Sequence, residues 1–140
     1  MKQEDKELLL KDLSARLPYK PIVQIDDCGI WSLRGIDHDD SAELRDRVIV
    51  WHGENYPSSK NSFPIINCKP YLFPLSSMTE EQKKELEDTL IEMQLKAISD
   101  EINGENVATY EIDFYNKHHI DYRGLIEKSL AIDATGLNIY

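Results

Sequence analysis

The segment Lys69-Pro70-Tyr71-Leu72-Phe73-Pro74-Leu75-Ser76-Ser77-Met78-Thr79-Glu80-Glu81-Gln82 marks where the pattern of the chain changes. Before it, short β-branched and aromatic runs alternate with Gly, Pro, Asn and Asp, which is typical of strands joined by turns. After it, apolar residues recur at intervals of three and four, which is typical of helices. We therefore expect a β part, 1–78, and an α part, 79–140, packed as one globular unit of a 140-residue chain.

In the β part, the sequence pattern predicts a helix that covers a small sheet, which we call the lid helix. The helix covers 4–17 and ends at Pro18, which disfavours the α conformation in the residue before it. Strands are predicted over 22–25, 30–36, 46–52 and 63–68, with a loop over 53–62. Pro64 lacks an N–H donor and places the last strand at an edge. The pattern favours a small twisted antiparallel sheet or an SH3-like barrel.

The α part begins with a helix whose start is well defined. Thr79 is the expected N-cap, and Gln82 completes a capping box. Two adjacent apolar stripes follow, one of Leu86, Leu90, Met93 and Ala97 and the other of Ile91, Leu95, Ile98 and Ile102. A face this broad needs a partner.

Two more helices are predicted after the expected stop at Asn103-Gly104. One covers 107–118, and the other covers 122–132 with Asp121 as its N-cap. The tail, 133–140, is expected to be loose. The fold class is therefore α+β, with an N-terminal helix, a small sheet or barrel, and two or three C-terminal helices.

Charge narrows the choice of partners. The net charge is −10, and residues 79–140 carry fourteen acidic and six basic side chains. Nucleic-acid binding draws its affinity from Lys and Arg on phosphates and is disfavoured. An acidic face favours a basic protein partner, or serves solubility. The longest early apolar run, Leu8 to Leu10, predicts neither a signal peptide nor a membrane span, so we expect a cytoplasmic protein.

The cluster His118-His119-Ile120-Asp121 contains the atoms that bind zinc, iron or manganese. Adjacent histidines on a helix point about 100° apart, however, so they cannot both hold one ion from a regular helix. The alternative is structural: Asp121 caps a helix, and one histidine closes the helix before it. We favour the structural interpretation and expect no metal.

Other candidate sites have simple structural alternatives. Asp37-His38-Asp39-Asp40 offers carboxylates to a hard cation, but a polar turn explains it. Cys28 and Cys68 are either nucleophiles served through the fold by His38 or His52, or small buried residues, and we favour the latter. The phosphate-loop, GxGxxG and GxSxG motifs are absent from the sequence, so no cofactor is expected.

Aromatic residues supply the candidate binding residues. Trp31 and Trp51 lie in predicted strands, where one of the two is expected to be exposed. Tyr71, Leu72 and Phe73 stand between two prolines and either plug the sheet or form an apolar ridge for a partner.

Two blocks, 69–82 and Phe114-Tyr115-Asn116-Lys117-His118-His119-Ile120-Asp121-Tyr122-Arg123-Gly124-Leu125-Ile126-Glu127-Lys128, resemble an uncharacterised family of small proteins from prophage-like and mobile regions of anaerobic gut bacteria. With Leu8 to Leu17 the resemblance covers about half the chain. The family usually has a glycine where Ser129 stands and a tail that contains proline. The resemblance implies an intracellular, phage-related setting. Because the family has no assigned activity, the resemblance implies no residue roles.

These observations lead to three functional hypotheses. The first is a non-enzymatic protein-binding or assembly module, which meets another protein or a second copy of itself through the acidic helical part and residues 71–74. The second is a small metal-dependent hydrolase that uses His118, His119 and Asp121. The third is an acidic nucleic-acid mimic or regulator that occupies a basic groove on another protein.

Overall fold

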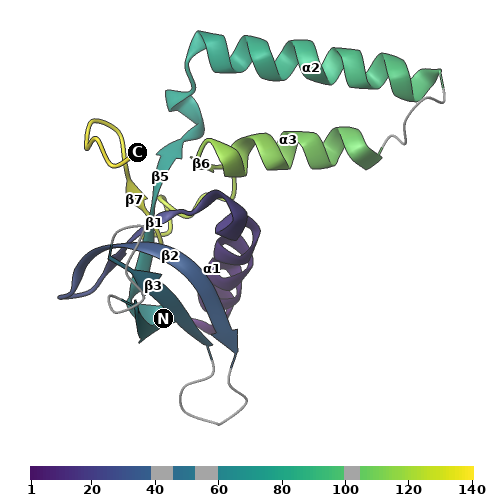
Figure 1. The fold of residues 1–140 in the computed structure, drawn as a ribbon. Coiled ribbons are helices and arrows are strands. Elements are labelled where there is room, and N and C mark those ends of the chain that lie inside the picture. The colour runs from purple at the N-terminus through teal and green to yellow at the C-terminus, as the bar shows by residue number, and fades with distance from the viewer. Residues whose placement is uncertain (39–45, 53–59, 100–104) are drawn as a thin grey trace.

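The computed structural model describes residues 1–38, 46–52, 60–99 and 105–140. Its elements are α1 (Gln3–Arg16), β1 (Ile22–Ile25), β2 (Gly29–His38), β3 (Asp46–Trp51), β4 (Lys60–Pro64), β5 (Cys68–Pro74), α2 (Glu80–Ile98), α3 (Glu105–Lys117), β6 (Ile120–Asp121) and β7 (Ile132–Asp133). Figure 1 shows the sheet with α1 beside it and the α2–α3 hairpin projecting from it. The predicted α+β class is confirmed.

The strands form one open, twisted sheet in the order β4-β3-β2-β1-β5-β6, and β7 also pairs with β5. Neighbours from β4 to β5 are antiparallel, whereas β6 and β7 run parallel to β5. Two alternatives were predicted, a twisted sheet and an SH3-like barrel. The sheet is open, so the structure has the twisted sheet and not the closed barrel. Residues 120–133 return to β5, so the two predicted parts of the chain share one sheet.

Local sequence explains the turn and the bend of the central hairpin. Asp27 and Gly29 adopt left-handed conformations, with φ of 59° and 87°, in the turn that joins β1 to β2. A register shift between Leu33 and Gly35 leaves Arg34 as the extra residue of a β-bulge. A Cβ on Gly35 would lie 3.3 Å from Ile49 Cδ1, so only glycine fits there without displacing that side chain.

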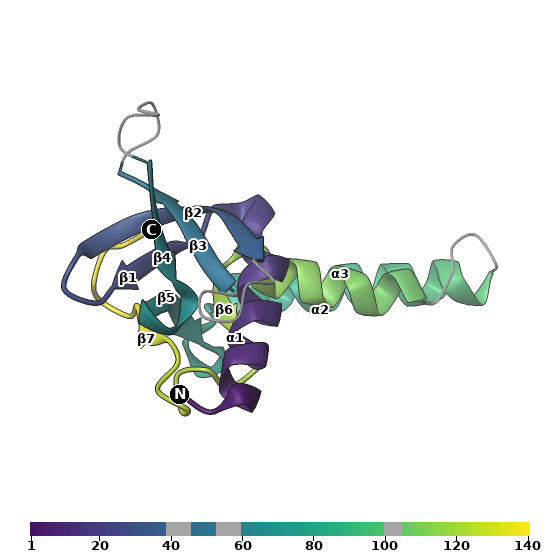
Figure 2. The same ribbon diagram turned by 90° about the horizontal axis from the view of Figure 1, so that it is seen from below.

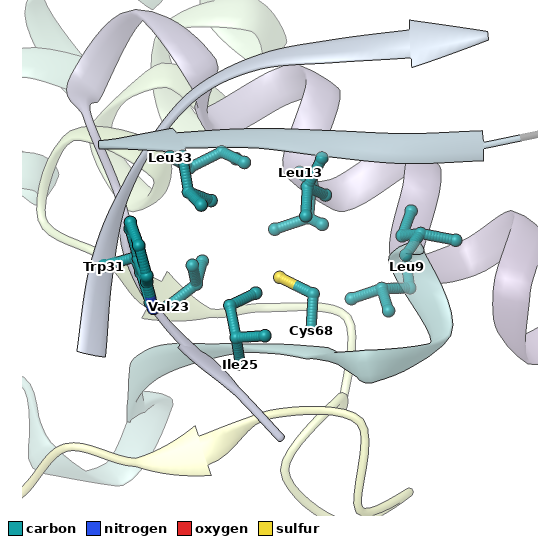
Figure 3. Packing of buried hydrophobic residues seen from close by; sticks show 10 residues of the cluster. Leu9, Leu13, Val23, Ile25, Trp31, Leu33 and Cys68 are labelled. Atoms are coloured by element: carbon teal, nitrogen blue, oxygen red, sulfur yellow. The ribbon is translucent and has the colours of Figure 1, made fainter. Parts of the chain in front are cut away.

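The core lies between α1 and one face of the sheet (Figure 3). Leu9 and Leu13, which lie one helical turn apart on α1, are fully buried. They meet alternate residues of the strands, which point to the same face of the sheet. These strand residues are Val23, Ile25, Trp31, Leu33, Val48, Val50 and Cys68. The predicted lid helix is therefore confirmed.

α2 and α3 form a hairpin that extends away from the sheet on the side where α1 lies (Figures 1 and 2). The capping box at its start is confirmed: Gln82 N donates to Thr79 Oγ1 at 3.1 Å, and Thr79 N donates to Gln82 Oε1 at 3.0 Å. The base of the hairpin is fixed to the body by a small cluster of Leu86, Phe114 and Ile120.

The predicted helix over 122–132 is wrong. The chain forms turns there and then the short strand β7. Gly124 and Ser129 have φ of 74° and 60°, and left-handed residues interrupt a right-handed helix. The tail is not loose either, because Ala134 N donates to Leu72 O at 2.8 Å and the Tyr140 hydroxyl is hydrogen-bonded in the sheet.

Strand boundaries differ from the prediction around the prolines. The predicted strand over 63–68 splits into β4, which does lie at the edge, and the start of β5. β5 is an inner strand of the sheet, although its two prolines indicate an interruption. The predicted polar turn over 37–40 is wrong for its first two residues, because Asp37 and His38 belong to strand β2 and pair with β3. Residues 39–40 and the predicted helix stop at 103–104 lie outside the described residues.

Candidate functional site

The segment 71–73 plugs the sheet and does not form an exposed ridge. Tyr71 is 6% exposed and Leu72 fully buried, with Leu72 packed against Leu125 and Leu130. Phe73 is half-buried, and its ring centroid lies 5.9 Å from that of Tyr140. Pairing with β6 and β7 covers this segment, so it does not present the binding surface that we predicted.

Trp31 is a core residue, because only 8% of it is exposed. Its ring stacks on His52 at 3.6 Å between centroids, and its Nε1 donates to Cys28 O at 2.9 Å. Trp51 is the more open indole, with the Arg34 guanidinium 5.1 Å from its ring centroid. The structure therefore places Trp51 on the open face of the sheet, and the prediction of Trp31 as a binding residue is wrong.

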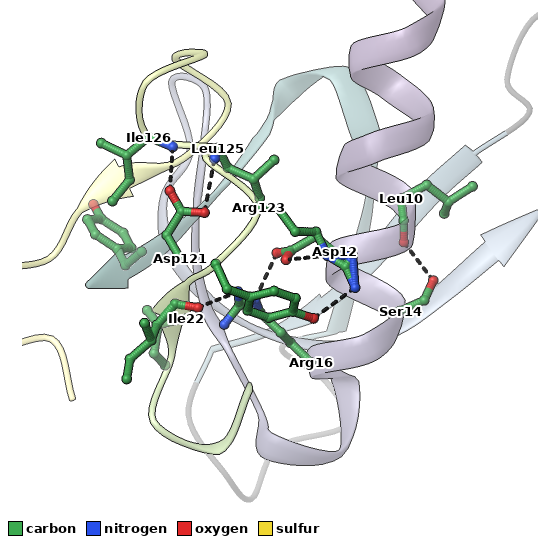
Figure 4. A network of polar contacts seen from close by, with 12 residues as sticks. Leu10, Asp12, Ser14, Arg16, Ile22, Asp121, Arg123, Leu125 and Ile126 are labelled. Carbon is green, nitrogen blue, oxygen red and sulfur yellow. Dashed lines mark hydrogen bonds and ion pairs between the residues drawn. The ribbon is translucent and has the colours of Figure 1, made fainter. Parts of the chain in front are cut away.

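The residues of the metal hypothesis have separate structural roles. Asp121 accepts hydrogen bonds from Leu125 N and Ile126 N, both at 2.9 Å, and so caps a turn where we expected a helix (Figure 4). His119 closes α3 in a left-handed conformation, with φ of 57°. No group of three His, Cys, Asp or Glu side chains across residues 1–38, 46–52, 60–99 and 105–140 is arranged to hold a metal.

The environments of the two histidines also differ from those of ligands. The His119 ring stacks on Tyr140 at 3.7 Å, and burial, followed by the nearby positive charges of Arg16 and His118, lowers its pKa to about 4. The His118 ring lies 4.5 Å from that of Phe114, and burial lowers its pKa as well. Both rings are aromatic packing partners.

The two thiols lie in contrasting places. Cys28 is exposed in the turn after β1, so the prediction of a small buried residue is wrong for it, whereas Cys68 is buried in the core as predicted. Burial, with a contribution from Asp26, raises the pKa of Cys68 to about 12. Because the thiolate is the reactive form, Cys68 is a packing residue and not a nucleophile.

A buried ionic network joins α1 to the C-terminal segment (Figure 4). Arg16 and Asp12 are fully buried, with Arg16 Nε 2.8 Å from Asp12 Oδ2. Arg16 Nη2 donates to Ile120 O at 2.7 Å, and Arg123 Nε lies 3.4 Å from Asp12 Oδ1. The i, i+4 spacing of Asp12 and Arg16 is the sequence signal for their pairing. The network fixes the segment that follows α3 to α1.

The broad apolar face of α2 has two different environments. Leu86 is buried, and Leu90, Met93 and Ala97 are partly buried on the side towards α3. The described part of the second stripe stays open, since Ile91 is 49%, Leu95 63% and Ile98 80% exposed, and Ile102 lies outside the described residues. These three residues, at i, i+4 and i+7, form one row, which we call the outer row. α3 therefore covers only half of the apolar face.

A shallow groove runs beside the outer row. Its volume is about 420 Å³, and Leu86, Leu90, Ile91 and Tyr115 contribute its apolar lining. Carboxylates border the row, with Glu87 on one side and Asp88 and Glu92 on the other. The sequence from 80 to 117 contains eleven acidic and four basic residues, a net charge of −7 out of −10 for the chain. The hairpin therefore presents an apolar strip within an acidic surface.

Lys83, Glu87 and Gln94 contribute the polar lining of this groove. No helix in the described part of the chain is long and apolar enough to span a membrane. Comparisons with protein-family models, curated proteins and solved structures find no match for this chain.

Proposed function

We propose that this protein is a non-enzymatic protein-binding module that acts inside the cell, and that the α2–α3 hairpin is its binding element. The outer row is the observation that supports this proposal. Its three large aliphatic side chains are about half exposed or more. Contiguous exposed apolar surface bordered by polar residues marks interaction sites in soluble proteins.

The spacing of the outer row and the charges beside it indicate the class of partner. The row matches the helix-in-groove mode, in which anchors spaced at i, i+4 and i+7 meet an apolar surface. The bordering carboxylates favour lysine and arginine on that partner and disfavour a second acidic surface. The proposed partner is therefore a basic, amphipathic protein surface.

The intracellular part of the proposal is supported by the cysteines. Neither Cys28 nor Cys68 forms a disulfide, as expected in a reducing compartment. The phage-related setting implied by the resemblance of residues 69–82 and 114–128 belongs to the same proposal.

Binding of a model partner tests the proposal. A fluorescein-labelled amphipathic helix of leucine and lysine, with about 18 residues and so about five turns, serves as the probe in fluorescence anisotropy. We expect a dissociation constant on the order of 10 μM for the wild type, and at least about tenfold weaker binding after Leu95→Ser with Ile98→Ser.

A matched control lies on the neighbouring helix. Ile112 on α3 is 43% exposed, so Ile112→Ser removes similar apolar surface outside the outer row and leaves binding unchanged. A leucine–glutamate peptide of the same length binds poorly because of charge repulsion. Equal binding of the leucine–lysine peptide by the wild type and the Leu95/Ile98 double variant would overturn the proposal.

A further inference from the structure

The face of the sheet opposite α1, which we call the outer sheet face, differs in charge from the hairpin. Side chains alternate along a strand, so the neighbours of the buried Val23, Leu33 and Val50 point to this face. Cross-strand pairing arranges them in two rows: Lys60, Trp51, Ser32 and Ile22 in one, and Ile30, Gln24 and Lys69 in the other.

This face combines apolar and basic groups. Ile30 is 47% exposed, and the half-buried Trp51 ring lies under the Arg34 guanidinium. Lys20, Arg34 and Trp51 contribute to a surface hollow of about 270 Å³. A half-buried indole and an exposed aliphatic side chain beside guanidinium and ammonium groups suit an apolar partner that carries carboxylates.

The charge of the outer sheet face is locally positive, although the chain as a whole is acidic. The hollow is lined by Lys20 and Arg34, and the two rows contain Lys60 and Lys69. Among the described residues, the neighbouring carboxylates are at the margins: Asp26 and Asp27 in the turn after β1, and Asp37 opposite Arg47.

We propose that the basic partner of the outer row is the outer sheet face of a second copy of this protein. This inference rests on the proposed function and names the partner. The acidic-apolar hairpin and the basic-apolar sheet face are complementary in charge, and each exposes aliphatic side chains. The hairpin projects on the side of α1, opposite the outer sheet face, so it does not reach this face in its own chain (Figures 1 and 2).

The contact is heterologous, because two different surfaces meet. Repetition of such a contact gives a ring if the rotation closes and a filament if it does not. Exposed charges dominate the complementarity, so association weakens when salt shortens the Debye length from about 30 Å at 0.01 M to about 3 Å at 1 M.

Sedimentation equilibrium of the full chain at low and high salt tests the inference. Two charge-reversal variants change one surface each. The sheet variant is Arg34→Glu with Lys69→Glu, and the hairpin variant is Glu87→Lys with Glu92→Lys. We expect species larger than a monomer for the wild type at low salt, and at least about tenfold weaker association of each variant alone. An equimolar mixture of the two variants recovers association, since each then offers a surface complementary to the other.

One control variant accompanies this test, and three outcomes would overturn the inference. Lys11→Glu reverses an exposed charge on α1, away from both surfaces, and retains wild-type association. Undiminished association of the sheet variant would show that the outer sheet face is not the partner surface and would overturn the inference. A wild type that stays monomeric at low salt while binding the leucine–lysine peptide would also overturn it, but would leave the proposed function standing. A wild type that neither associates nor binds the peptide would overturn both.

Discussion

The sheet body and the helical hairpin use aliphatic residues in opposite ways. In the body, Leu9, Leu13 and Leu33 are fully buried between α1 and the sheet. In the hairpin, Leu95 and Ile98 are mostly exposed, although they belong to an equally regular apolar pattern. The same type of sequence signal therefore marks a core in one region and an open surface in the other. The difference arises because, in the described part of the chain, α3 packs against one side of α2 and leaves the other side open.

The polar groups show the same contrast. The body contains a buried charge network, in which Arg16 and Asp12 are removed from solvent. The described ion pairs of the hairpin are exposed, such as Lys96 with Glu92 at 3.3 Å. Exposed pairs of this kind contribute about 0.3–0.5 kcal/mol, whereas breaking a buried pair costs about 3–5 kcal/mol. Stability is therefore concentrated in the body, and the hairpin surface is free to serve interaction.

The largest expected effect comes from the buried network. Arg16→Met leaves the Asp12 carboxylate buried beside Arg123 alone, and we expect a loss of about 3–5 kcal/mol in the free energy of unfolding, measured by urea denaturation. The double variant Arg16→Met with Asp12→Leu removes both charges and recovers part of the loss. If Arg16→Met costs less than about 1 kcal/mol, the network does not anchor the body.

The next effect compares two leucines of α2. Leu86 is 8% exposed at the base of the hairpin, so Leu86→Ala costs about 2–4 kcal/mol in the free energy of unfolding. Leu95→Ala changes it by less than about 0.5 kcal/mol, because Leu95 is already in contact with solvent. Equal losses for the two variants would contradict the division of the helix into a packed base and an open row.

A smaller effect is expected at the turn after β6. Asp121→Ala deprives Leu125 N and Ile126 N of their acceptor, and we expect a loss of about 1–3 kcal/mol in thermal or urea unfolding. Added zinc does not alter the stability of the wild type in this account, because the carboxylate is occupied by backbone donors. Stabilisation of the wild type by zinc that disappears in Asp121→Ala would revive the metal hypothesis.

The smallest of these effects is a pH dependence from His119. Its pKa is lowered from 6.5 to about 4 in the folded protein. Between these values the unfolded chain binds more protons than the folded chain, so the free energy of unfolding falls as pH drops from 6.5 to 4 and levels off below. Partial exposure of the ring limits the loss to about 1–2 kcal/mol. Asparagine tolerates the left-handed backbone, so His119→Asn removes this part of the pH dependence. Identical pH curves for the wild type and this variant would exclude a contribution from His119.

Much of the body could be predicted from the sequence, because its signals are local. Pro18 ends α1, the turn at Asp27 and Gly29 joins β1 to β2, and Thr79 with Gln82 starts α2. Each of these features depends on residues within a few positions of one another. The fold class and the lid over the sheet followed from them.

The errors arose where distant contacts override local preference. The segment over 122–132 has helical spacing, but Asp121 and the left-handed Gly124 and Ser129 hold it in turns. β5 contains two prolines and still forms an inner strand, because β6 and β7 pair with it from far along the chain.

The candidate site was predicted in part. The second apolar stripe of α2 was identified from its spacing, but its exposure depends on where α3 lies. Residues 71–73 were expected at the surface as one alternative, and the return of the C-terminal segment buries most of them. The partner of Arg16 at Ile120 lies 104 positions away and has no sequence signal.

Isoleucine methyl NMR during titration with the leucine–lysine peptide shows whether the outer row is the binding surface. The δ1 methyls report on the outer row through Ile91 and Ile98, and on the core through the buried Ile25 and Ile65. We expect the signals of Ile91 and Ile98 to shift and saturate, while those of Ile25 and Ile65 stay in place. Stationary Ile91 and Ile98 signals at saturating peptide, or shifts of equal size at all four positions, would contradict binding at the outer row.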